Sequence, residues 1–540
     1  MWQQDYTPIA GSIGWSAAAA SLPMWVLFFF LAVWRKRAWI SAVASLVTGV
    51  LVAGLVYRMP PVRLFSAVLF GAAFGLLPIG WITFCAILLY RLTVRTGQFE
   101  VIKRSLSRLT TDRRLQALLI GFAFGGFIEG AAGSGVPVAV GAAMLAGMGF
   151  DRFQAAGLCL LANTAPVAFA AIGTPILTLA ATTGLPLDRL SADVGRICAP
   201  ISLCIPAYLT VLVAGWRGLR GALPAVLVCG ISFASVQLLV SNEIGPQTTA
   251  ILASLAAMAC LIILLRVWGP RGRFHTANQI PSKLGPQDGS MAIWKAWLPY
   301  VLLAGCVLAW GLPPVRLFLG RASLPFDWPL LHNYVLRIPP VVAVVAPYAA
   351  QYNLDWLATA GTACLFANVL SAFFVGMSCR EFGRVFTSTG REMLLPLLTI
   401  ASVLGLAFVM NYSGATATLG LAFAATSRLF PFFSAMLGWV GVFLTGSDTS
   451  ANALFGNLQV VTAKRLGLSP ILMAAANSSG GVMGKMISIQ SIAVAVAATG
   501  MKSSEEAKLF RFTFKHSLLL ASVIGLLTAF YAYVEPGWVR

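Results

Sequence analysis

The stretch GFIEGAAGSGVPVAV, residues 126–140, places one carboxylate, Glu129, among fourteen small or apolar residues. Glycine and proline least favour a continuous helix, and four of them interrupt the stretch: Gly130, Gly133, Gly135 and Pro137. The surrounding segment, residues 115–150, is apolar on both sides of this interruption. We therefore predict a re-entrant hairpin with its tip near residues 129–137; two short membrane crossings are the alternative.

The rest of the chain is also apolar. Of its 540 residues, 59% are hydrophobic and only 10% are charged, and the mean hydropathy is +0.84. Runs long enough to cross about 30 Å of hydrocarbon cover residues 16–34, 39–57, 64–90, 197–215, 221–240, 248–265, 292–311, 355–376 and 513–534. With the interrupted segments added, we predict an all-α polytopic membrane protein with about 11–14 membrane segments.

The charged, cysteine and histidine residues argue against other classes of protein. The net charge is +20, but Lys and Arg lie in short loops beside the apolar runs, as membrane topology requires, so we expect no nucleic-acid partner. The nine cysteines lie singly, with no CxxC pair that would indicate a disulfide framework or a metal site. The histidines, His275, His332 and His516, form no HExxH motif. We expect a protein that is not an enzyme and that uses no metal or cofactor.

Basic loops predict the membrane topology. Residues 35–37 and 91–114 are rich in Lys and Arg and should be cytoplasmic, which leaves the N-terminus outside. Counting spans from these loops predicts that the first hairpin enters from the cytoplasmic side. A second interrupted segment, about residues 432–462, should enter from outside. Residues 312–354 show no clear span and leave the path of the chain open there.

Two similar stretches predict an internal repeat. GGFIEGAAGS (125–134) matches GVFLTGSDTS (441–450) at several positions, and each is followed at a similar distance by a second motif, ANTAP (162–166) or ANSSG (476–480). Chance matching of small residues in a biased sequence is the alternative. The shared spacing favours a repeat.

The repeat predicts how the chain is divided. Two inverted halves, residues 1–266 and 292–540, would be joined by a cytoplasmic linker, residues 267–291. Each half would contain a hairpin and a broken helix: about 115–150 and 154–183 in the first, and about 432–462 and 470–497 in the second. The second broken helix should be interrupted at its glycines, Gly480, Gly481 and Gly484. Paired interruptions of this kind point to a transport site at the midplane, where inverted repeats meet.

Interrupted helices leave backbone groups unpaired, and free N–H groups suit an anion such as a carboxylate. The polar residues near the interruptions that could assist, by hydroxyl, amide or backbone N–H, are Ser134, Asn163, Thr164, Ser447, Thr449, Ser450, Asn477, Ser478 and Ser479. For any single Ser or Thr among them, back-bonding to its own helix is the competing role.

Three ionisable residues lie within these apolar tracts: Glu129, Asp448 and Lys485. Charges at membrane depth cost at least about 3 kcal/mol, so they usually mark a pathway or pair with a partner. Glu129 is the candidate proton carrier, because burial favours the neutral form of a carboxyl. Asp448 is a second candidate for proton coupling, or an ionised helix cap. Lys485 is either a counter-ion for a substrate carboxylate or one member of a structural ion pair.

The same residues carry a resemblance to a known family. The motifs FIEGAAGSGVPVAV (127–140), LANTAPVAFAAIGTP (161–175), NYSGATATLGLAF (411–423), GSDTSANALFGNLQ (446–459) and NSSGGVMGKMISIQSIAVA (477–495) together resemble the bacterial L-lactate permeases. The resemblance runs from Trp2 to the final span. It implies proton-coupled transport of L-lactate, D-lactate and glycolate across the inner membrane. Within its motifs, Asn452 and Gln490 join the candidate substrate-binding residues.

Two departures from the family's usual pattern bear on the substrate. Where the family usually has Gly-Phe-Gly-Thr-Pro, this chain has Gly133 to Pro137 with Ser134 in place of the aromatic residue. Where the family usually has Ser-Pro-Gln, it has Ser488, Ile489 and Gln490. The loss of an aromatic side chain at a predicted hairpin tip could enlarge the site, so the monocarboxylate class is predicted more firmly than lactate itself.

We therefore predict a symporter for short 2-hydroxy acids and protons that works by alternating access. A sodium-coupled carboxylate transporter and an anion channel remain the alternatives. The expected partners are the small carboxylate, the proton and the lipid bilayer; a homodimer is left open by the sequence.

Overall fold

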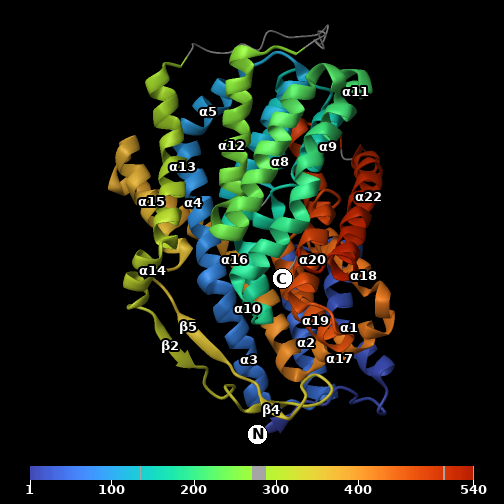
Figure 1. The fold of residues 1–540 in the computed structure, drawn as a ribbon. Helices are drawn as coiled ribbons and strands as arrows, with labels where there is room; N and C mark the ends of the chain where they lie inside the picture. The colour runs from blue at the N-terminus through green and yellow to red at the C-terminus, as the bar shows by residue number, and fades with distance from the viewer. Residues whose placement is uncertain (134, 271–287, 503–504, 539–540) are drawn as a thin grey trace.

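The computed structural model describes residues 1–133, 135–270, 288–502 and 505–538. In these residues, long helices form the body of the molecule (Figure 1). Ten of them are long and apolar enough to cross a membrane, or eleven if one bent pair is counted as a single span. This confirms an all-helical membrane protein, at the lower end of the predicted number of segments. Ser134 and residues 271–287 of the predicted linker lie outside the described residues.

Residues 1–116 supply a pair of packed helices, α1 (Ile13–Phe28) and α2 (Ala38–Leu51), and a bent span. Their other helices are α3 (Pro61–Phe74), α4 (Trp81–Arg95), α5 (Gln98–Ser107) and α6 (Arg113–Gln116), with wider π-helical turns η1 (Phe29–Val33), η2 (Val52–Val56) and η3 (Gly75–Gly80). Pro78 interrupts the span between α3 and α4, where Leu77 leaves the helical conformation. Residues 64–90 are predicted from the sequence as one continuous run; the bend arises because Pro78 removes a backbone donor.

The interrupted segments of the first half follow. They are η4 (Ala117–Phe124), α7 (Gly125–Ala131), α8 (Val136–Gly147), α9 (Arg152–Ala162), η5 (Val167–Phe169) and α10 (Ala170–Thr183). The segment η4–α7 and α8 lie antiparallel, because a Cβ on Gly121 would contact the Leu145 side chain near the far end of α8. The pair α9 and η5–α10 is bent by 63°. Both interruptions therefore turn the chain sharply.

The helix α11 (Leu187–Glu243) folds back on itself at Gly215, and α12 (Pro246–Val267) follows it. Gly215 has φ +65°, which favours glycine. The Ser191 hydroxyl donates to the Ser241 carbonyl, 50 residues further along the chain, at 2.8 Å. The two arms are therefore antiparallel, and they supply the two predicted spans at 197–215 and 221–240.

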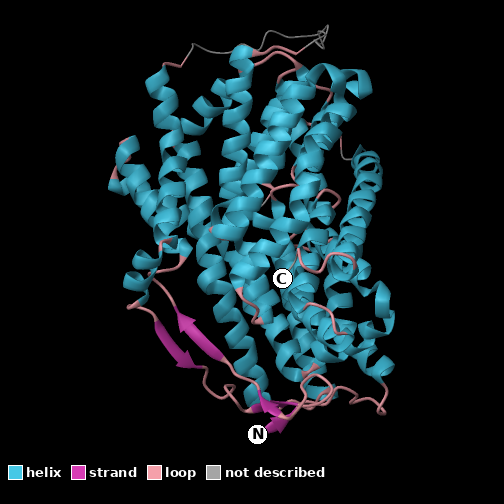
Figure 2. Ribbon diagram, viewed as in Figure 1, coloured by secondary structure: helices cyan, strands magenta, loops and turns pink. Residues whose placement is uncertain are grey.

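Residues 312–354, whose path the sequence left open, include short strands that the all-α prediction did not contain. The segment runs from α13 (Ser290–Gly311) and α14 (Pro313–Gly320) through β2 (Leu324–Asp327), β3 (Val335–Arg337), β4 (Ala346–Pro347) and β5 (Gln351–Leu354). Strand β2 pairs with β5, and β1 (Trp2–Gln3) with β3. These strands and the N-terminus lie at one end of the molecule, opposite α5 (Figures 1 and 2). Prolines at 325, 329, 339 and 340 prevent a continuous helix here.

The second half repeats the pattern of interruptions. It contains α15 (Ala360–Val375), α16 (Cys379–Ser413), α17 (Ala415–Phe423), η6 (Ala424–Leu429), α18 (Phe430–Thr445), α19 (Asp448–Leu466), α20 (Pro470–Lys485), α21 (Ile489–Thr499) and α22 (Glu506–Tyr533). The helices α18 and α19 fold against each other, because a Cβ on Gly441 would contact Ala451 and Phe455. The interruption between α20 and α21 lies at residues 486–488.

The prediction that glycines break the second helix at residues 480–484 is wrong. The helix α20 continues through them to Lys485. A Cβ on Gly480 would collide with the Ala435 carbonyl of α18, and one on Gly484 with the Trp439 carbonyl. The glycines four residues apart therefore let two backbones touch, as small residues do between membrane helices.

We predict that Gly438→Ala destabilises the protein by about 1–3 kcal/mol, because a Cβ there would collide with the Asn477 backbone carbonyl, which cannot move aside as a side chain can. The apparent melting temperature in detergent should fall. The control is Gly305→Ala on α13, where a Cβ meets nothing within 4 Å. Equal melting temperatures for the two variants would contradict close packing of α18 on α20.

Candidate functional site

The interrupted segments of both halves surround one cavity of about 280 Å³. The first hairpin contributes Glu129, Gly133 and Gly135, and the second contributes residues 446–450. The first broken helix contributes residues of the 167–175 segment, and the second contributes Lys485 and Gln490. The volume is slightly below the roughly 300–1,000 Å³ of pockets for drug-sized ligands, which suits a ligand of few atoms.

Seven of the predicted site residues line this cavity: Glu129, Ser447, Asp448, Thr449, Ser450, Lys485 and Gln490. Five others lie outside the lining and are buried: Thr164, Asn452, Asn477, Ser478 and Ser479. Asn163 is also buried outside the lining, beside Glu129. Ser134 lies outside the described residues. The predicted residues that the structure describes therefore form two groups: seven that line the cavity and six that are buried outside the lining.

Glu129 and Asn163 form the polar part of the first tip. Glu129 is 1% exposed and Asn163 is 3% exposed. In the described residues, Oε2 of Glu129 and both amide atoms of Asn163 lack hydrogen bonds, although the amide lies next to the carboxyl. Buried polar atoms are normally paired, so the Glu129 carboxyl, which lines the cavity, is a group that a ligand would satisfy, whereas Asn163 lies beside it outside the lining.

The backbone beside this tip is unwound. Ala171, Ile172 and Gly173 follow one another with φ of +44°, +58° and +74°. A non-glycine residue in the left-handed region costs roughly 1–2 kcal/mol, and Ile172 is branched at Cβ. Ala171 lines the cavity and packs against Gly133 of the hairpin tip. Strain of this kind clusters at functional sites, where the surrounding structure maintains it.

The second tip is built around Ser447 and Asp448. The chain turns at Gly446, with φ +70°, and Ser447 caps α19 by accepting a hydrogen bond from the Ser450 N–H at 3.3 Å. The helix-cap alternative for Asp448 is therefore wrong, since the neighbouring serine fills that role. The Asp448 carboxylate instead accepts from Ser478 at 2.6 Å and from Asn452 at 3.4 Å.

A buried amide network supports Asp448 from behind. Asn477 donates to Oδ1 of Asn452 at 2.9 Å, and Gln459 donates to Oδ1 of Asn477 at 3.0 Å. Asn452 also donates to the Pro175 carbonyl at 3.2 Å, which ties the second half to the unwound segment of the first. Thr164, by contrast, back-bonds to the Leu161 carbonyl at 2.7 Å. Asn452 and Asn477 therefore position the site without lining it.

Lys485 lies between the two carboxyl groups. Its ammonium donates to the Gly446 carbonyl at 2.7 Å. It is within electrostatic range of both Glu129 and Asp448. In the described residues it forms no ion pair within 4.0 Å with either, so the alternative of a structural ion pair is absent from this conformation. The ammonium is half-buried at the cavity wall.

The sequence missed several polar residues that the fold brings near the site. Thr83, Thr174 and Ser491 line the cavity but lie in apolar runs without any distinguishing pattern. Asp193 precedes the predicted span at 197–215 and was not among the candidate residues. It lies inside α11 and is 0% exposed.

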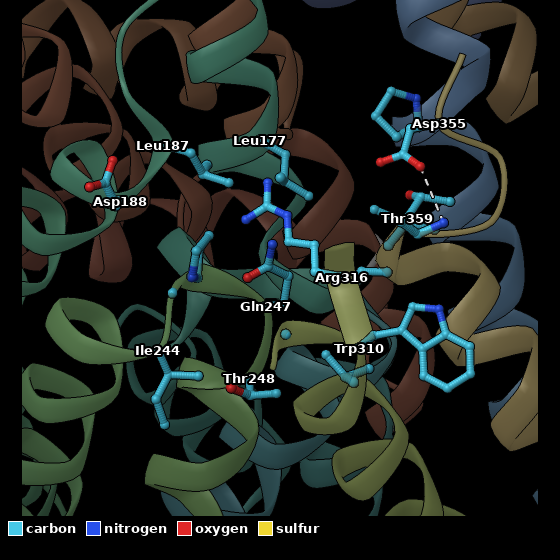
Figure 3. Close-up of a pocket in the computed structure, with 18 of the residues that line it drawn as sticks. Leu177, Leu187, Asp188, Ile244, Gln247, Thr248, Trp310, Arg316, Asp355 and Thr359 are labelled. Atoms are coloured by element: carbon cyan, nitrogen blue, oxygen red, sulfur yellow. Dashed lines mark hydrogen bonds between the residues drawn. The ribbon is translucent and has the colours of Figure 1, made fainter. Parts of the chain in front are cut away.

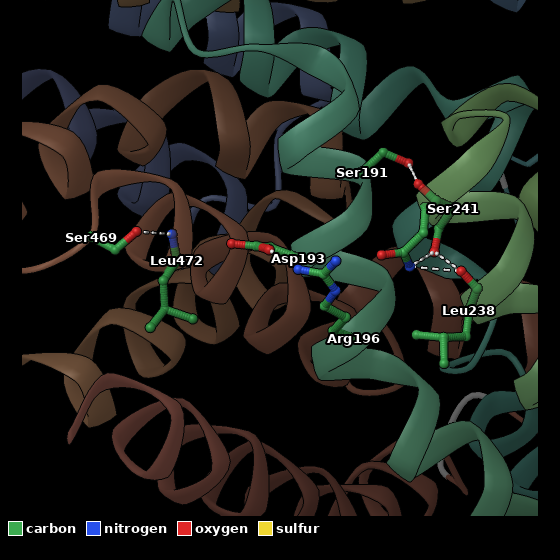
Figure 4. Close-up of polar contacts among 8 residues, drawn as sticks. Ser191, Asp193, Arg196, Leu238, Ser241, Ser469 and Leu472 are labelled. Carbon is green, nitrogen blue, oxygen red and sulfur yellow. Dashed lines mark hydrogen bonds and ion pairs between the residues drawn. The ribbon is translucent and has the colours of Figure 1, made fainter. Parts of the chain in front are cut away.

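Asp193 is a further buried ionisable residue. Arg196 donates to its Oδ1 at 3.3 Å, and in the described residues Oδ2 has no hydrogen bond. Figure 4 shows the carboxylate between Arg196 and the start of α20 at Ser469 and Leu472. The Asp–Arg spacing of three residues in SADVGR (191–196) was the available signal.

A polytopic helical protein whose interrupted segments meet at a small polar cavity within the membrane helices is a membrane transporter rather than an enzyme. The profile of the L-lactate permease family matches residues 16–535. The chain belongs to the L-lactate permease family.

Several relatives match over nearly their full length. An L-lactate permease of Bacillus subtilis is 46% identical, over 98% of this chain and 98% of that protein. The L-lactate permease of Escherichia coli K12 is 43% identical over 99% and 98%, and its glycolate permease GlcA is 44% identical over 99% of each chain.

Two solved structures are similar at low sequence identity. MtrF of Neisseria gonorrhoeae is 13% identical, with 87% of this chain and 84% of that chain covered and a TM-score of 0.46. The YdaH transporter of Alcanivorax borkumensis is 15% identical, with 88% of each chain covered and a TM-score of 0.47.

We predict that Ser478→Ala lowers stability by about 1–3 kcal/mol, because it removes a donor to the buried Asp448 carboxylate. The neighbouring variant Ser479→Ala is the matched control, since in the described residues its buried hydroxyl donates to no carboxylate and lies against Cys198. Melting temperatures of the purified variants measure the difference. Equal losses in the two would contradict the positioning role of Ser478.

Proposed function

We propose that the protein imports short 2-hydroxy monocarboxylates, L-lactate, D-lactate and glycolate, together with protons, across the bacterial inner membrane. The observation that carries the proposal is the shared cavity, which is bounded by the interrupted segments of both halves and contains two carboxyl groups and one ammonium group. The names of the relatives, L-lactate permease and glycolate permease, support the substrate class.

The charges at the cavity favour coupling between the anion and protons. With Glu129 and Asp448 ionised and Lys485 protonated, the three groups carry a net charge of −1 by their formal charges. A carboxylate that entered would raise the local negative charge in a low-dielectric site, which is costly. Protonation of a carboxyl group removes that cost, so proton binding and anion binding promote each other reciprocally.

The lining residues divide naturally into roles for such a substrate. Lys485 provides a charged donor for the substrate carboxylate, and Thr449, Ser450 and Gln490 provide neutral polar groups. Ser134 is assigned to the same substrate-binding set on its position in the sequence. Glu129 is assigned as the proton carrier, with Asp448 as the second proton-coupling residue.

Two inverted repeats, residues 1–266 and 292–540, would move relative to one another to expose the cavity alternately to each side. The antiparallel hairpins at 117–147 and 430–466, each followed by an interrupted helix, support this division. A homodimer is compatible with the scheme, because each chain has a complete cavity of its own.

Sodium coupling is a second candidate that one observation favours. The left-handed backbone at residues 171–173 and the unpaired Asn163 amide lie beside Glu129, and oxygen atoms of such groups can bind a cation. Proteoliposome uptake driven separately by a pH gradient and by a Na⁺ gradient distinguishes the two. A panel of lactate, glycolate and larger 2-hydroxy acids in the same assay tests the substrate class.

We predict that Glu129→Gln abolishes accumulation driven by a pH gradient, because the amide cannot carry a proton, while exchange of substrate across the membrane partly survives. Labelled lactate uptake and counterflow in proteoliposomes measure the two activities. The control is Glu392→Gln, which removes an exposed carboxylate that lies outside the cavity and pairs with Arg91. Normal accumulation by Glu129→Gln would remove Glu129 from the coupling mechanism.

We also predict that Lys485→Met raises the KM for lactate by about 10- to 100-fold, the effect of losing a hydrogen bond to a charged group. Lys464→Met, which removes an exposed charge near the end of α19, is the control. Initial uptake rates over a range of lactate concentrations give the KM of each variant. An unchanged KM would return Lys485 to a structural role through its bond to Gly446.

A further inference from the structure

A second cavity, of about 600 Å³, lies on the side of the molecule that carries the strands. Its wall is formed by the end of α10, the start of α11, the turn between α11 and α12, the segment α13–α14, strand β5 and the start of α15. It is about twice the volume of the cavity between the hairpin tips. None of the residues discussed above as site residues lines it.

Arg316 of α14 is the cation of this second cavity. Figure 3 shows its guanidinium extending between Leu177, Leu187 and Gln247. In the described residues, Arg316 forms no ion pair and no hydrogen bond. Its five donors are therefore free to bind an anion, and a guanidinium matches a carboxylate with two parallel hydrogen bonds.

The two carboxylates in the wall do not neutralise Arg316. Asp355 accepts from the Ser323 hydroxyl at 2.9 Å and from the Ala358 N–H at 3.2 Å, so local bonds occupy it (Figure 3). Asp188 lies in the first turn of α11, where the positive end of the helix stabilises a negative charge.

A second group of donors faces the same space. The helix α12 begins after Gly245, and Gln247 and Thr248 of its first turn line the cavity. The first N–H groups of a helix have no intrahelical acceptor, and this end of the helix carries partial positive charge. The guanidinium and the helix start come from different elements, and together they form the pattern of an anion site.

The two cavities share their walls. On the segment η3–α4, Pro78 and Ile82 face the larger cavity, and Ile79 and Thr83 face the smaller one. On α10, Leu177 lines the larger cavity, and Thr174 and Pro175 line the smaller. Residues of both segments line both spaces, so a ligand in the larger cavity lies next to the cavity of Glu129 and Asp448.

We propose that the larger cavity is an antechamber in which Arg316 and the start of α12 bind a small organic carboxylate before it passes between residues 77–83 and 174–177. The inference rests on the proposed transport function. Arg316 is exposed, so water competes with the substrate for its guanidinium, and the site binds substrate transiently rather than tightly.

The test is uptake kinetics of the full-length protein in cells, with lactate as the probe. Arg316→Gln should raise the KM for lactate by about 3- to 10-fold, the effect of one exposed charge contact, and change the maximal rate by less than about twofold. Arg316→Lys, which keeps the charge, should recover most of the affinity.

The matched control is Arg321→Gln. Arg321 ends the same helix, α14, but it contacts the Phe318 ring and lies outside the cavity wall. Its removal should leave the KM within about twofold of wild type while removing one exposed positive charge close to Arg316 in the sequence. A rise in KM equal to that of Arg316→Gln would reduce the effect to general electrostatics and overturn the antechamber.

The remaining outcomes are separable. Wild-type protein without lactate uptake would contradict the proposed function itself. Wild-type uptake with a normal KM in Arg316→Gln would overturn the antechamber alone. If the Arg316 variants do not fold, the KM of the wild-type protein should still rise with ionic strength, because an exposed guanidinium is screened by salt. A KM that does not depend on salt would overturn the proposal.

Discussion

The structure depends on the direct backbone contact between α18 and α20. Gly438 lies against the Asn477 carbonyl, Gly480 against that of Ala435, and Gly484 against that of Trp439. Lipid tails are as apolar as leucine, so close packing and polar contacts, not a hydrophobic gain, hold membrane helices together. This contact brings Ser478 against the start of α19 and Lys485 against the second hairpin tip. Each side chain of the second tip therefore has its place because two helices touch without side chains between them.

The polar groups beside this contact link the two halves of the chain. Asn452 donates to the Pro175 carbonyl, and Thr182 of α10 donates to the Asn452 carbonyl at 3.4 Å. Asn411 of α16 donates to the Thr182 carbonyl at 3.3 Å. In a low-dielectric interior such networks are costly to break, because breaking them leaves buried polar groups unsatisfied. Relative movement of the halves must therefore exchange these bonds for others, which restricts the chain to a few discrete arrangements.

The sequence predicted the fold where a residue has a local effect and failed where the effect depends on a distant partner. Glycine and proline near residue 130 predicted a sharp turn, and the chain turns there, because a left-handed φ or a missing N–H acts on the backbone directly. Gly480 and Gly484 have the same local signature, yet α20 is continuous through them, because their role is set by α18. For Asp448 too, the sequence could suggest only a local role, that of a helix cap. Only the fold shows that Ser447 caps the helix and that Ser478, thirty residues away in sequence, binds the carboxylate.

Charged residues in long apolar tracts identified the candidate site from the sequence, but other functional candidates with charged side chains were missed. Glu129, Asp448 and Lys485 stood out because a charge in a long apolar tract is costly, and the fold places all three at one cavity. Asp193 lies close to Arg189 and Arg196 in the sequence, and Arg316 lies in the segment 312–354 whose path the sequence left open, so neither was selected. The fold buries the first and leaves the second unpaired beside a cavity. Among the described residues, each of two adjacent spaces is therefore lined by one cation that forms no ion pair, Arg316 in the larger and Lys485 in the smaller. In the proposed path, a small anion that moves from one space to the other exchanges one positive partner for the next, and residues of the segments 77–83 and 174–177 line both spaces. The larger cavity has carboxylates of its own, Asp188 and Asp355, and on that path the anion meets Glu129 and Asp448 only after it has left Arg316.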